Sequence, residues 1–458
     1  MNPELSASLR KNWHIVTVAF LVAVFCILSV LLFRSYTVRE FPDSREYETV
    51  AHAHIFSSGF WTGIRPVTMP LLLKLSRYNL ATFAIIQLAL NLICWSVLAV
   101  VVVQTFRRQW VKIAGAAVIL AFALTVDVTL WNGTALSESL ALSLHALLLA
   151  IALWCVRKFA MKQQASVPHQ IFLASGIAVL ATLWSFTRDA NMYFLLGVAG
   201  ILLLSLLLQR KTLRRYGVFL LLLIIMFGGI FLVQSASQSA GKRWEIPLIN
   251  VLGQRILPFP AETTFFTEKG MQLNPGVLCF ANNTASDCGM DFSGFEPWIS
   301  RSGVRSYERF LLEHPSRLFL DPLRNIGELV SGDMAHYYPS AGTVPRTFSE
   351  VPAPQWQKVL TRILFPRDIV VALLAVLALG SFVLSAVHRR LDLRWSVPIV
   401  LLLLAYPLFV VVWHGDAKEV QRHALMVDVQ MILSFWMIIL LGFDSHSNVR
   451  TDTSHRGK

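Results

Sequence analysis

The sequence predicts an all-α polytopic membrane protein with about ten transmembrane helices. Hydrophobic residues make up 55% of its 458 residues and charged residues only 15%, whereas ordinary soluble domains carry about 25% charged residues. A helix that spans a bilayer needs about 20 apolar residues. Ten apolar runs come close to that length, and they cover residues 14–33, 81–104, 111–128, 137–156, 170–187, 192–208, 216–234, 369–387, 395–413 and 424–443.

Basic residues in the short loops predict the orientation of these helices, because cytoplasmic loops are enriched in lysine and arginine. Such residues follow the second, fourth, sixth, eighth and tenth runs, and the short loops on the other side contain few. We therefore expect both termini in the cytoplasm and both long loops, 34–80 and 235–368, outside a bacterial cytoplasmic (inner) membrane. The net charge of +13 largely reflects this topology and does not indicate a nucleic-acid partner. The basic residues include Arg107, Arg108, Lys112, Arg157, Lys158, Lys162, Arg210, Lys211, Arg214, Arg215, Arg389, Arg390, Arg394, Arg450, Arg456 and Lys458.

Three parts follow from this pattern. Residues 1–234 form an N-terminal transmembrane module of seven helices, and residues 369–458 form a C-terminal module of three helices and an inner tail. Residues 235–368 contain Pro, Gly and aromatic residues throughout, and we expect a small extracytoplasmic cap with helices near 307–314 and 317–330. Cys279 and Cys288 could form a disulfide in an oxidising compartment, or remain free thiols.

The stretch from Glu40 to Leu75 contains more charge than a simple connection between two membrane helices needs. We expect two juxtamembrane helices in it. One covers 44–58 and is capped by Asp43 or Ser44; the other covers 64–77, with Pro66 in its first turn. Together, Asp43 and Arg65 near the lipid boundary suggest the acid-bearing half of an active site at the membrane surface.

Ionisable side chains gather at one level of the predicted protein, the outer ends of the helices. Such groups are costly beside a bilayer and tend to be functional. Carboxylates with arginines fit a general base that works opposite an anionic leaving group, and the planar fork of arginine suits phosphate. Transfer from a lipid-linked phosphate to an acceptor hydroxyl is the chemistry that this pattern favours. The residues are Asp43, Arg65, Glu138, Arg188, Asp189, Glu419, Arg422 and His423.

Five pieces of sequence occur in an order that is similar to a known family. They are FPDSREYETVA after the first predicted helix, then RPVTMPLLLKL, LSESLALSL, TRDANMY and finally GDAKEVQRHAL before the last helix. With these pieces the chain resembles the GT-C superfamily of polytopic glycosyltransferases, which includes the protein O-mannosyltransferases and the aminoarabinose transferases of lipid A. The resemblance implies a GT-C-like fold. It also implies an inverting transfer of a sugar from a polyprenyl-phosphate donor to a glycan, lipid or protein acceptor at the outer membrane face.

The resemblance also implies roles for individual residues. Asp43 matches by position the acid of the first outer loop and would be the general base. Its neighbour Ser44 stands where many members have a second acid, for which Glu40 could partly substitute, and this departure leaves dependence on a divalent metal, Mg²⁺ or Mn²⁺, open. The expected secondary acids are Glu138 and Asp189; the expected ligands of the donor phosphate are Arg65, Arg188, Arg422 and His423; and the expected supporting residues are Glu40, Tyr47 and Glu419.

Other interpretations remain open from the sequence. Asp43 could simply cap a helix, Arg65 could anchor at headgroups, and Arg188 could pair with Asp189. An O-antigen ligase or polymerase would rely on arginines and histidines of the late outer loop, and a transporter or flippase would need helices that break within the membrane, for example at Gly228-Gly229. The late-loop residues are Arg301, Arg305, Arg309, His314, Arg317 and His336.

Overall fold

The computed structural model describes residues 3–161, 166–208, 210–331, 334–339 and 343–446. Within these ranges nine helices are long and apolar enough to cross a membrane, or ten if a bent pair of shorter helices is counted as one span. The predicted fold class, an all-α polytopic membrane protein, is therefore confirmed. The predicted inner tail beyond residue 446 lies outside the described residues.

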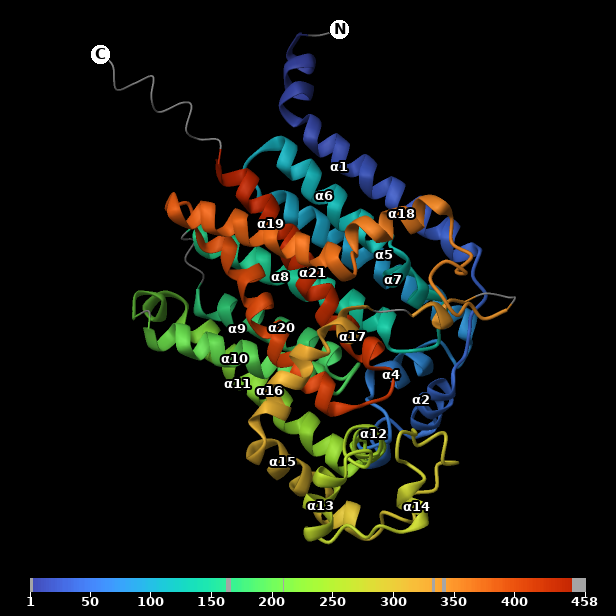
Figure 1. The fold of residues 1–458 in the computed structure, drawn as a ribbon. Helices are drawn as coiled ribbons and strands as arrows, with labels where there is room; N and C mark the ends of the chain where they lie inside the picture. Colours follow the sequence, from blue (N-terminus) through green and yellow to red (C-terminus); the bar gives the residue numbers. More distant parts are fainter. Residues whose placement is uncertain (1–2, 162–165, 209, 332–333, 340–342, 447–458) are drawn as a thin grey trace.

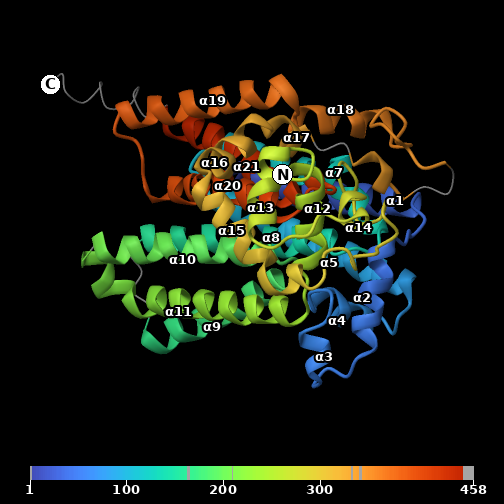
Figure 2. The same cartoon turned by 60° about the horizontal axis from the view of Figure 1, so that its bottom comes forward.

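The last spanning helix, α21, is the most buried of the candidate spans, with 78% of its apolar window buried against 17% for α19. It contacts α19, α20 and α6, whereas α9, α10 and α11 pack on one another in a separate layer, which Figure 2 shows on the side opposite α19. The spanning helices are α1 (Pro3–Arg34), α5 (Leu80–Thr105), α6 (Gln109–Ala123), α8 (Glu138–Ala160), α9 (Val167–Ser185), α10 (Asn191–Leu208), α11 (Arg210–Ala240), α19 (Asp368–Val387), α20 (Ser396–Gly415, preceded by η4, Leu393–Trp395) and α21 (Val420–His446).

The third span is broken, although its apolar run of 111–128 predicted one continuous helix. The chain bends by 56° between α6 and the short helices α7 (Val126–Thr129) and η1 (Leu130–Gly133). Backbone groups freed inside a membrane protein need new partners, and α18 (Gln355–Leu364) supplies them. The Gln357 amide donates to the Leu124 carbonyl at 2.9 Å, and the Thr361 hydroxyl accepts from the Val126 N–H at 2.9 Å.

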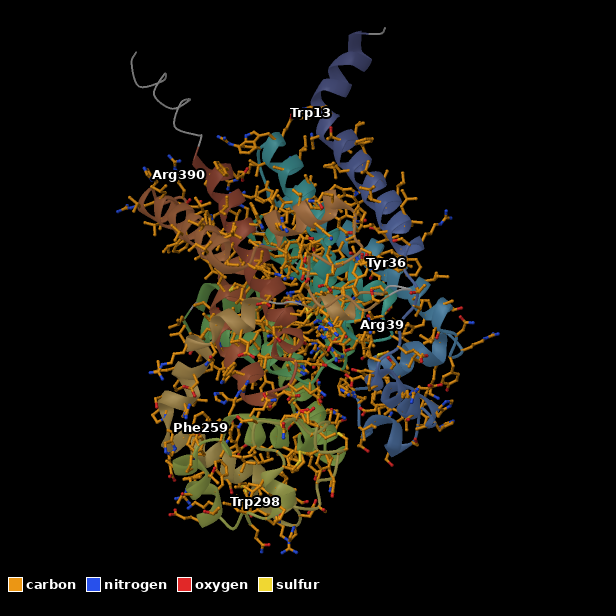
Figure 3. The ribbon with its side chains drawn as sticks, turned by 45° about the vertical axis from the view of Figure 1, so that its right-hand side comes forward. Trp13, Tyr36, Arg39, Phe259, Trp298 and Arg390 are labelled. Atoms are coloured by element: carbon orange, nitrogen blue, oxygen red, sulfur yellow. A yellow bond between two sulfur atoms is a disulfide. The ribbon has the colours of Figure 1, made fainter. Side chains whose placement is uncertain are left out.

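Residues 235–368, which we call the outer region after their predicted side of the membrane, divide into two parts. One has its own hydrophobic core, which includes Leu252, Phe266, Phe280 and Phe295, and the Cys279–Cys288 disulfide lies in it. Figure 1 shows this part at the bottom, away from the start of α1 and the end of α21, and Figure 3 shows Phe259 and Trp298 within it. Its helices are α12 (Glu245–Arg255), α13 (Pro260–Glu268), α14 (Pro275–Leu278), η2 (Ile299–Gly303) and α15 (Val304–Glu313).

The other part of the outer region lies against the spanning helices. Helix α16 (Pro315–Arg324) contacts α20, and α17 (Ile326–Ser331) contacts α21 and α19. The helix expected over 317–330 is therefore two helices, which meet at Asn325. The turn η3 (Ala335–Tyr337) follows and reaches the first outer loop, where Arg39 donates to the His336 carbonyl at 2.8 Å.

The first outer loop contains α2 (Pro42–His52), α3 (Ser58–Trp61) and α4 (Thr68–Leu75). The expected helix over 44–58 is therefore shorter. Its N-cap is Phe41, whose N–H donates to the Ser44 hydroxyl at 2.9 Å. The prediction that Asp43 or Ser44 occupies the cap position is wrong, because the helix begins at Pro42, two residues before the expected start at residue 44. Likewise, Pro66 precedes α4 instead of lying in its first turn.

Candidate functional site

Four separate segments bring their charged side chains together at the ends of the spanning helices that are predicted to face outside. Asp43 lies in the first turn of α2, and Glu138 is the first residue of α8. Arg188 lies in the turn between α9 and α10, and Arg422 lies in the first turn of α21. Hydrogen bonds and ion pairs connect these four residues, so the clustering predicted from topology corresponds to actual contacts. We call these residues, with Arg65, Glu419 and His423, the ionic cluster.

Both oxygens of Asp43 are held by arginines. Its Oδ1 lies 2.6 Å from Arg65 Nη2 and its Oδ2 lies 2.9 Å from Arg422 Nη1. Burial favours the neutral acid, but the charges of Arg65 and Arg422 outweigh it and hold the pKa of Asp43 below its ordinary value. Asp43 is therefore an ionised carboxylate in an enclosed position, and its side chain is not used as a helix cap.

Glu138 is the most deeply buried member of the ionic cluster, with 1% of its surface exposed. Its Oε1 accepts hydrogen bonds from Arg422 Nε at 2.6 Å and from Arg188 Nη1 at 3.2 Å. Its Oε2 is buried and has no hydrogen-bond partner among the described residues. Glu138 is therefore more than a helix-start acid, because it fixes two arginines at once.

Arg422 occupies the centre of the ionic cluster. Its Nη1 also donates to Glu419 at 2.9 Å, so three carboxylates surround one guanidinium group that is almost completely buried. The ring of Tyr337 covers the face of this guanidinium, with 5.2 Å between the Arg422 Cζ and the ring centroid. Planar hydrogen bonding and stacking on an aromatic face are the two contacts that arginine makes and lysine does not.

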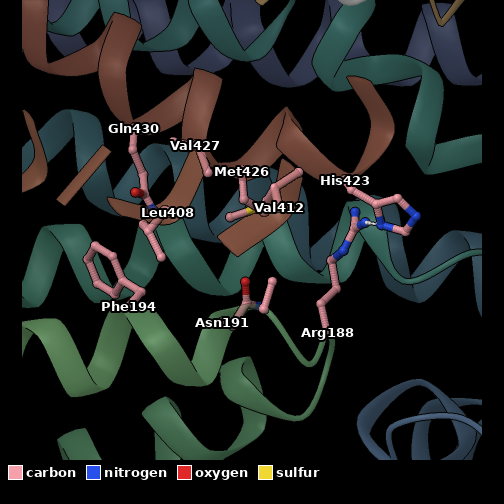
Figure 4. A pocket seen from close by; sticks show the side chains of 10 residues that line it. Arg188, Asn191, Phe194, Leu408, Val412, His423, Met426, Val427 and Gln430 are labelled. Atoms are coloured by element: carbon pink, nitrogen blue, oxygen red, sulfur yellow. Dashed lines mark hydrogen bonds between the residues drawn. The ribbon is translucent and has the colours of Figure 1, made fainter. Parts of the chain in front are cut away.

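His423 holds Arg188 and does not face outward as a cation. Its Nδ1 lies 2.8 Å from Arg188 Nη2, and Figure 4 shows this contact. A guanidinium can only donate hydrogen bonds, so Nδ1 must accept here and the ring proton belongs on Nε2, which lies 3.5 Å from Asp416 Oδ2. In this arrangement the Nδ1 lone pair is already used, and a neutral His423 orients Arg188.

A narrow pocket borders the ionic cluster between α10, α20 and α21. Arg188 and His423 lie at one end of it, as Figure 4 shows. The rest of its lining is mostly apolar, so a charged group at the cluster would have a hydrophobic continuation beside it. The other lining residues are Ala190, Asn191, Phe194, Leu408, Val412, Met426, Val427 and Gln430.

Asp189 lies outside the ionic cluster, although it follows Arg188 directly in the chain. It pairs with Arg243 at 2.8 Å and 3.0 Å, and Arg243 also donates to the Gly63 carbonyl at 3.0 Å. A Cβ on Gly241 would collide with the same stretch of backbone. Asp189 and Arg243 thus tie the end of α11 to the first outer loop. The alternative that Arg188 and Asp189 pair with each other is wrong, because adjacent side chains in this turn point to different partners.

The predicted supporting residues differ in position. Tyr47 is buried, donates to Ser137 Oγ at 3.2 Å and lies under Arg65, whose Cζ is 5.4 Å from the ring centroid. Glu419 contacts Arg422, as described above. Glu40 is exposed, and among the described residues no hydrogen bond or ion pair joins it to the ionic cluster. It therefore does not replace the second acid of the resemblance.

Sequence reasoning missed three residues around the site. Glu46 holds Arg65 Nε at 2.6 Å, and its spacing of three from Asp43 on one helix could have identified it. Arg243 carried no signal, because it lies 54 residues after its partner Asp189. Tyr337 carried none either, since it comes from the outer region and reaches Arg422 only through the fold.

Arginines occupy most carboxylate oxygens at the centre of the ionic cluster. Both oxygens of Asp43 and the paired oxygen of Glu138 contact guanidinium groups, so a metal bound there would lie beside several positive charges. Among the described ranges no group of three or more His, Cys, Asp or Glu side chains is placed to hold a metal ion. The arrangement instead suits an anion that competes with the carboxylates for the arginines.

The residues that a ligase, a polymerase or a transporter would need show no comparable cluster of contacts among the described residues. Arg309 pairs with Glu313, and Arg317 with Asp321, inside the outer region. Helix α11 continues through Gly228 and Gly229 without a break. Arg301 and Arg305 are exposed.

Comparison of the whole chain with protein-family models and with curated proteins found no match to either. The GT-C resemblance therefore stays a prediction that depends on the quoted residues, and the geometry of the ionic cluster is the independent basis for a functional proposal.

Proposed function

We propose that this protein is a membrane glycosyltransferase that moves a sugar from a polyprenyl-phosphate donor to an acceptor hydroxyl at the outer membrane face. The observation that supports this most is the convergence of Asp43 from the first outer loop with Arg65, Arg188 and Arg422 at one site, where the two arginines Arg188 and Arg422 are buried and Asp43 and Arg65 are 25% and 27% exposed. A base and a group of arginines are the two components that the reaction needs: one for the acceptor proton and one for the leaving phosphate.

The adjoining pocket also favours a lipid-linked donor over a soluble one. A phosphate held by Arg188 would have apolar side chains such as Phe194, Leu408 and Val412 beside it, and the free space among them, about 10 Å³, holds only about one water, so a lipid chain enters when these side chains move apart. A phosphate at the depth of the helix ends is where an anionic lipid carries its charge. Soluble nucleotide sugars would gain nothing from these apolar walls.

The reaction proceeds as a single displacement. The acceptor oxygen bonds to the anomeric carbon of the sugar as its proton passes to Asp43, and the bond from that carbon to the phosphate oxygen breaks, leaving the electron pair on the phosphate. Attack opposite the leaving phosphate inverts the anomeric centre. The phosphate gains negative charge as the bond breaks, and Arg65, Arg188 and Arg422 stabilise that charge more than the ground state.

Donor binding and the basicity of Asp43 are coupled in this scheme. While Arg65 and Arg422 contact both of its oxygens, the pKa of Asp43 is lowered and the carboxylate is a weak base. A phosphate that takes over guanidinium donors would release Asp43 lone pairs and raise its pKa. The base therefore becomes effective when a donor is present, which limits the reaction to the donor-bound state.

The experiment uses the purified full chain in detergent and a panel of radiolabelled polyprenyl-phosphate sugars, with and without EDTA. Wild-type protein should release sugar to an acceptor or to water, and Asp43→Asn should lose about 10²-fold or more of the rate, as expected for loss of a general base. EDTA should leave turnover unchanged. Glu48→Gln is the matched control, because Glu48 lies on the same helix with a half-exposed side chain.

Equal turnover by wild type and Asp43→Asn would remove Asp43 from the chemistry. Tight binding of a polyprenyl phosphate without turnover of any donor would contradict the transferase and favour a lipid transporter. Turnover that disappears with EDTA and returns with Mg²⁺ or Mn²⁺ would overturn the argument that the cluster does not fit a metal.

A further inference from the structure

Tyr337 lies at the centre of an aromatic contact that joins the outer region to the ionic cluster. Its side chain is 2% exposed. Its ring packs against Phe41 of the first outer loop, with centroids 5.0 Å apart, and against Trp131 of η1 at 5.2 Å. The His336 ring lies 4.1 Å from the Tyr337 ring as well, and the Arg422 Cζ lies over the Tyr337 ring, 5.2 Å from its centroid.

The backbone on both sides of Tyr337 is fixed as well. Arg39 donates to the carbonyls of His336 at 2.8 Å and of Tyr338 at 3.4 Å. The ring of Tyr338 meets Tyr36 edge to face, with 5.2 Å between centroids. Figure 3 places Tyr36 and Arg39 midway between Trp13 at one end of the molecule and Trp298 at the other. Residues 334–339 are thus held by the stretch just before α2, close to the base Asp43.

The hydrogen bonds of Arg422 hold the edge of its guanidinium, whereas the Tyr337 ring contacts the group without using any N–H donor. Glu138, Asp43 and Glu419 bind the edge of the guanidinium. When a donor phosphate takes one or more of these donors, part of that restraint disappears. A ring on the guanidinium face does not compete with phosphate, so it would keep the plane of Arg422 fixed in both states.

We propose that Tyr337 is a positioning residue, which holds the guanidinium of Arg422 in the plane needed to bind the donor phosphate. The inference rests on the proposed function for the identity of the anion. The contact itself does not depend on it. The hydroxyl of Tyr337 is buried beside Glu419 and Arg422, so Tyr337→Phe is the variant that separates the ring face from the hydroxyl.

The test compares Tyr337→Leu, Tyr337→Phe and Tyr338→Leu in the full chain. Tyr337→Leu removes the aromatic face, Tyr337→Phe keeps it, and Tyr338→Leu perturbs the same segment at an equally buried ring that touches Tyr36. For Tyr337→Leu we expect the KM of the polyprenyl-phosphate donor to rise about tenfold or more, as for loss of a desolvated cation–π contact. Tyr337→Phe should restore the KM, and Tyr338→Leu should lower only thermal stability.

A second measurement keeps the inference testable if no donor is turned over. Tyr337→Leu and Arg422→Gln are combined in a double-mutant cycle, and the midpoint of unfolding is measured in detergent. Non-additive effects are expected, because removing Arg422 leaves the ring nothing to position. Additive effects would overturn the inference whatever the reaction is. So would an equal rise in KM for Tyr337→Leu and Tyr338→Leu, since a general loss of packing would then explain both.

Discussion

Replacing Glu138 by glutamine should destabilise this protein far more than the same change at Glu46. Both side chains bind an arginine of the ionic cluster at 2.6 Å, so the ion pairs look alike when only distance is considered. They differ in burial. Glu138 is 1% exposed and its partners Arg422 and Arg188 are 7% and 9% exposed, whereas Glu46 and Arg65 are 37% and 27% exposed.

The expected magnitudes follow from that difference. Removing one partner of a buried ion pair costs about 3–5 kcal/mol, because the other charge stays buried without compensation. Glu138→Gln would leave Arg188 with only neutral partners, His423 and the Arg422 carbonyl. An exposed pair contributes about 0–1 kcal/mol, which is the range expected for Glu46→Gln.

The assay is chemical unfolding of the purified protein in mixed micelles, followed by tryptophan fluorescence. Glu138→Gln should shift the midpoint several times further than Glu46→Gln. Adding Arg188→Gln to Glu138→Gln should recover part of the loss, because it removes the uncompensated charge. Equal shifts for the two single variants would refute the reasoning, as would a double variant less stable than the sum of its parts.

Two further predictions concern the neighbouring acids. Arg65 and Arg422 lower the pKa of Asp43 in the folded state. The contribution of Asp43 to stability is therefore complete above its unfolded pKa of about 4 and is lost as the pH falls through the folded pKa. When unfolding is measured between pH 7 and pH 3, Asp43→Asn should lose less stability with acid than wild type does. Asp189→Asn should weaken the ion pair with Arg243 and lower the unfolding midpoint. Because this pair lies outside the ionic cluster, the donor KM should stay within about twofold of the wild-type value. A KM rise as large as that of an Arg422 variant would instead place Asp189 in the binding site.

Much of the membrane architecture followed directly from the sequence. An apolar run of about 20 residues has few alternatives to a spanning helix, because a helix is the only open-chain structure that satisfies its own backbone inside lipid. The third run shows the limit of that argument. No residue between 111 and 128 predicts a break in the helix. The break is possible because Gln357 and Thr361 of α18, more than 200 residues away in the chain, hydrogen-bond the backbone groups that it frees.

Local chemistry was misjudged where several residues compete for one position. Asp43 and Ser44 are both good caps, and the sequence offered them for the start of α2. Because the helix begins at Pro42, Phe41 is the cap residue, and the Phe41 N–H donates to the Ser44 hydroxyl. Asp43 was thereby left for Arg65 and Arg422.

The sequence by itself determined the fold class and the level at which charged residues would gather, because both depend on composition and on the cost of charge in a bilayer. Only the tertiary structure decided which charges meet. Arg188 and Asp189 are neighbours in the chain, yet Arg188 contacts Glu138 and His423. Asp189 instead contacts Arg243. Partner choice depends on the direction of each side chain and on which helix end lies opposite, and neither quantity is contained in the spacing of residues along the chain.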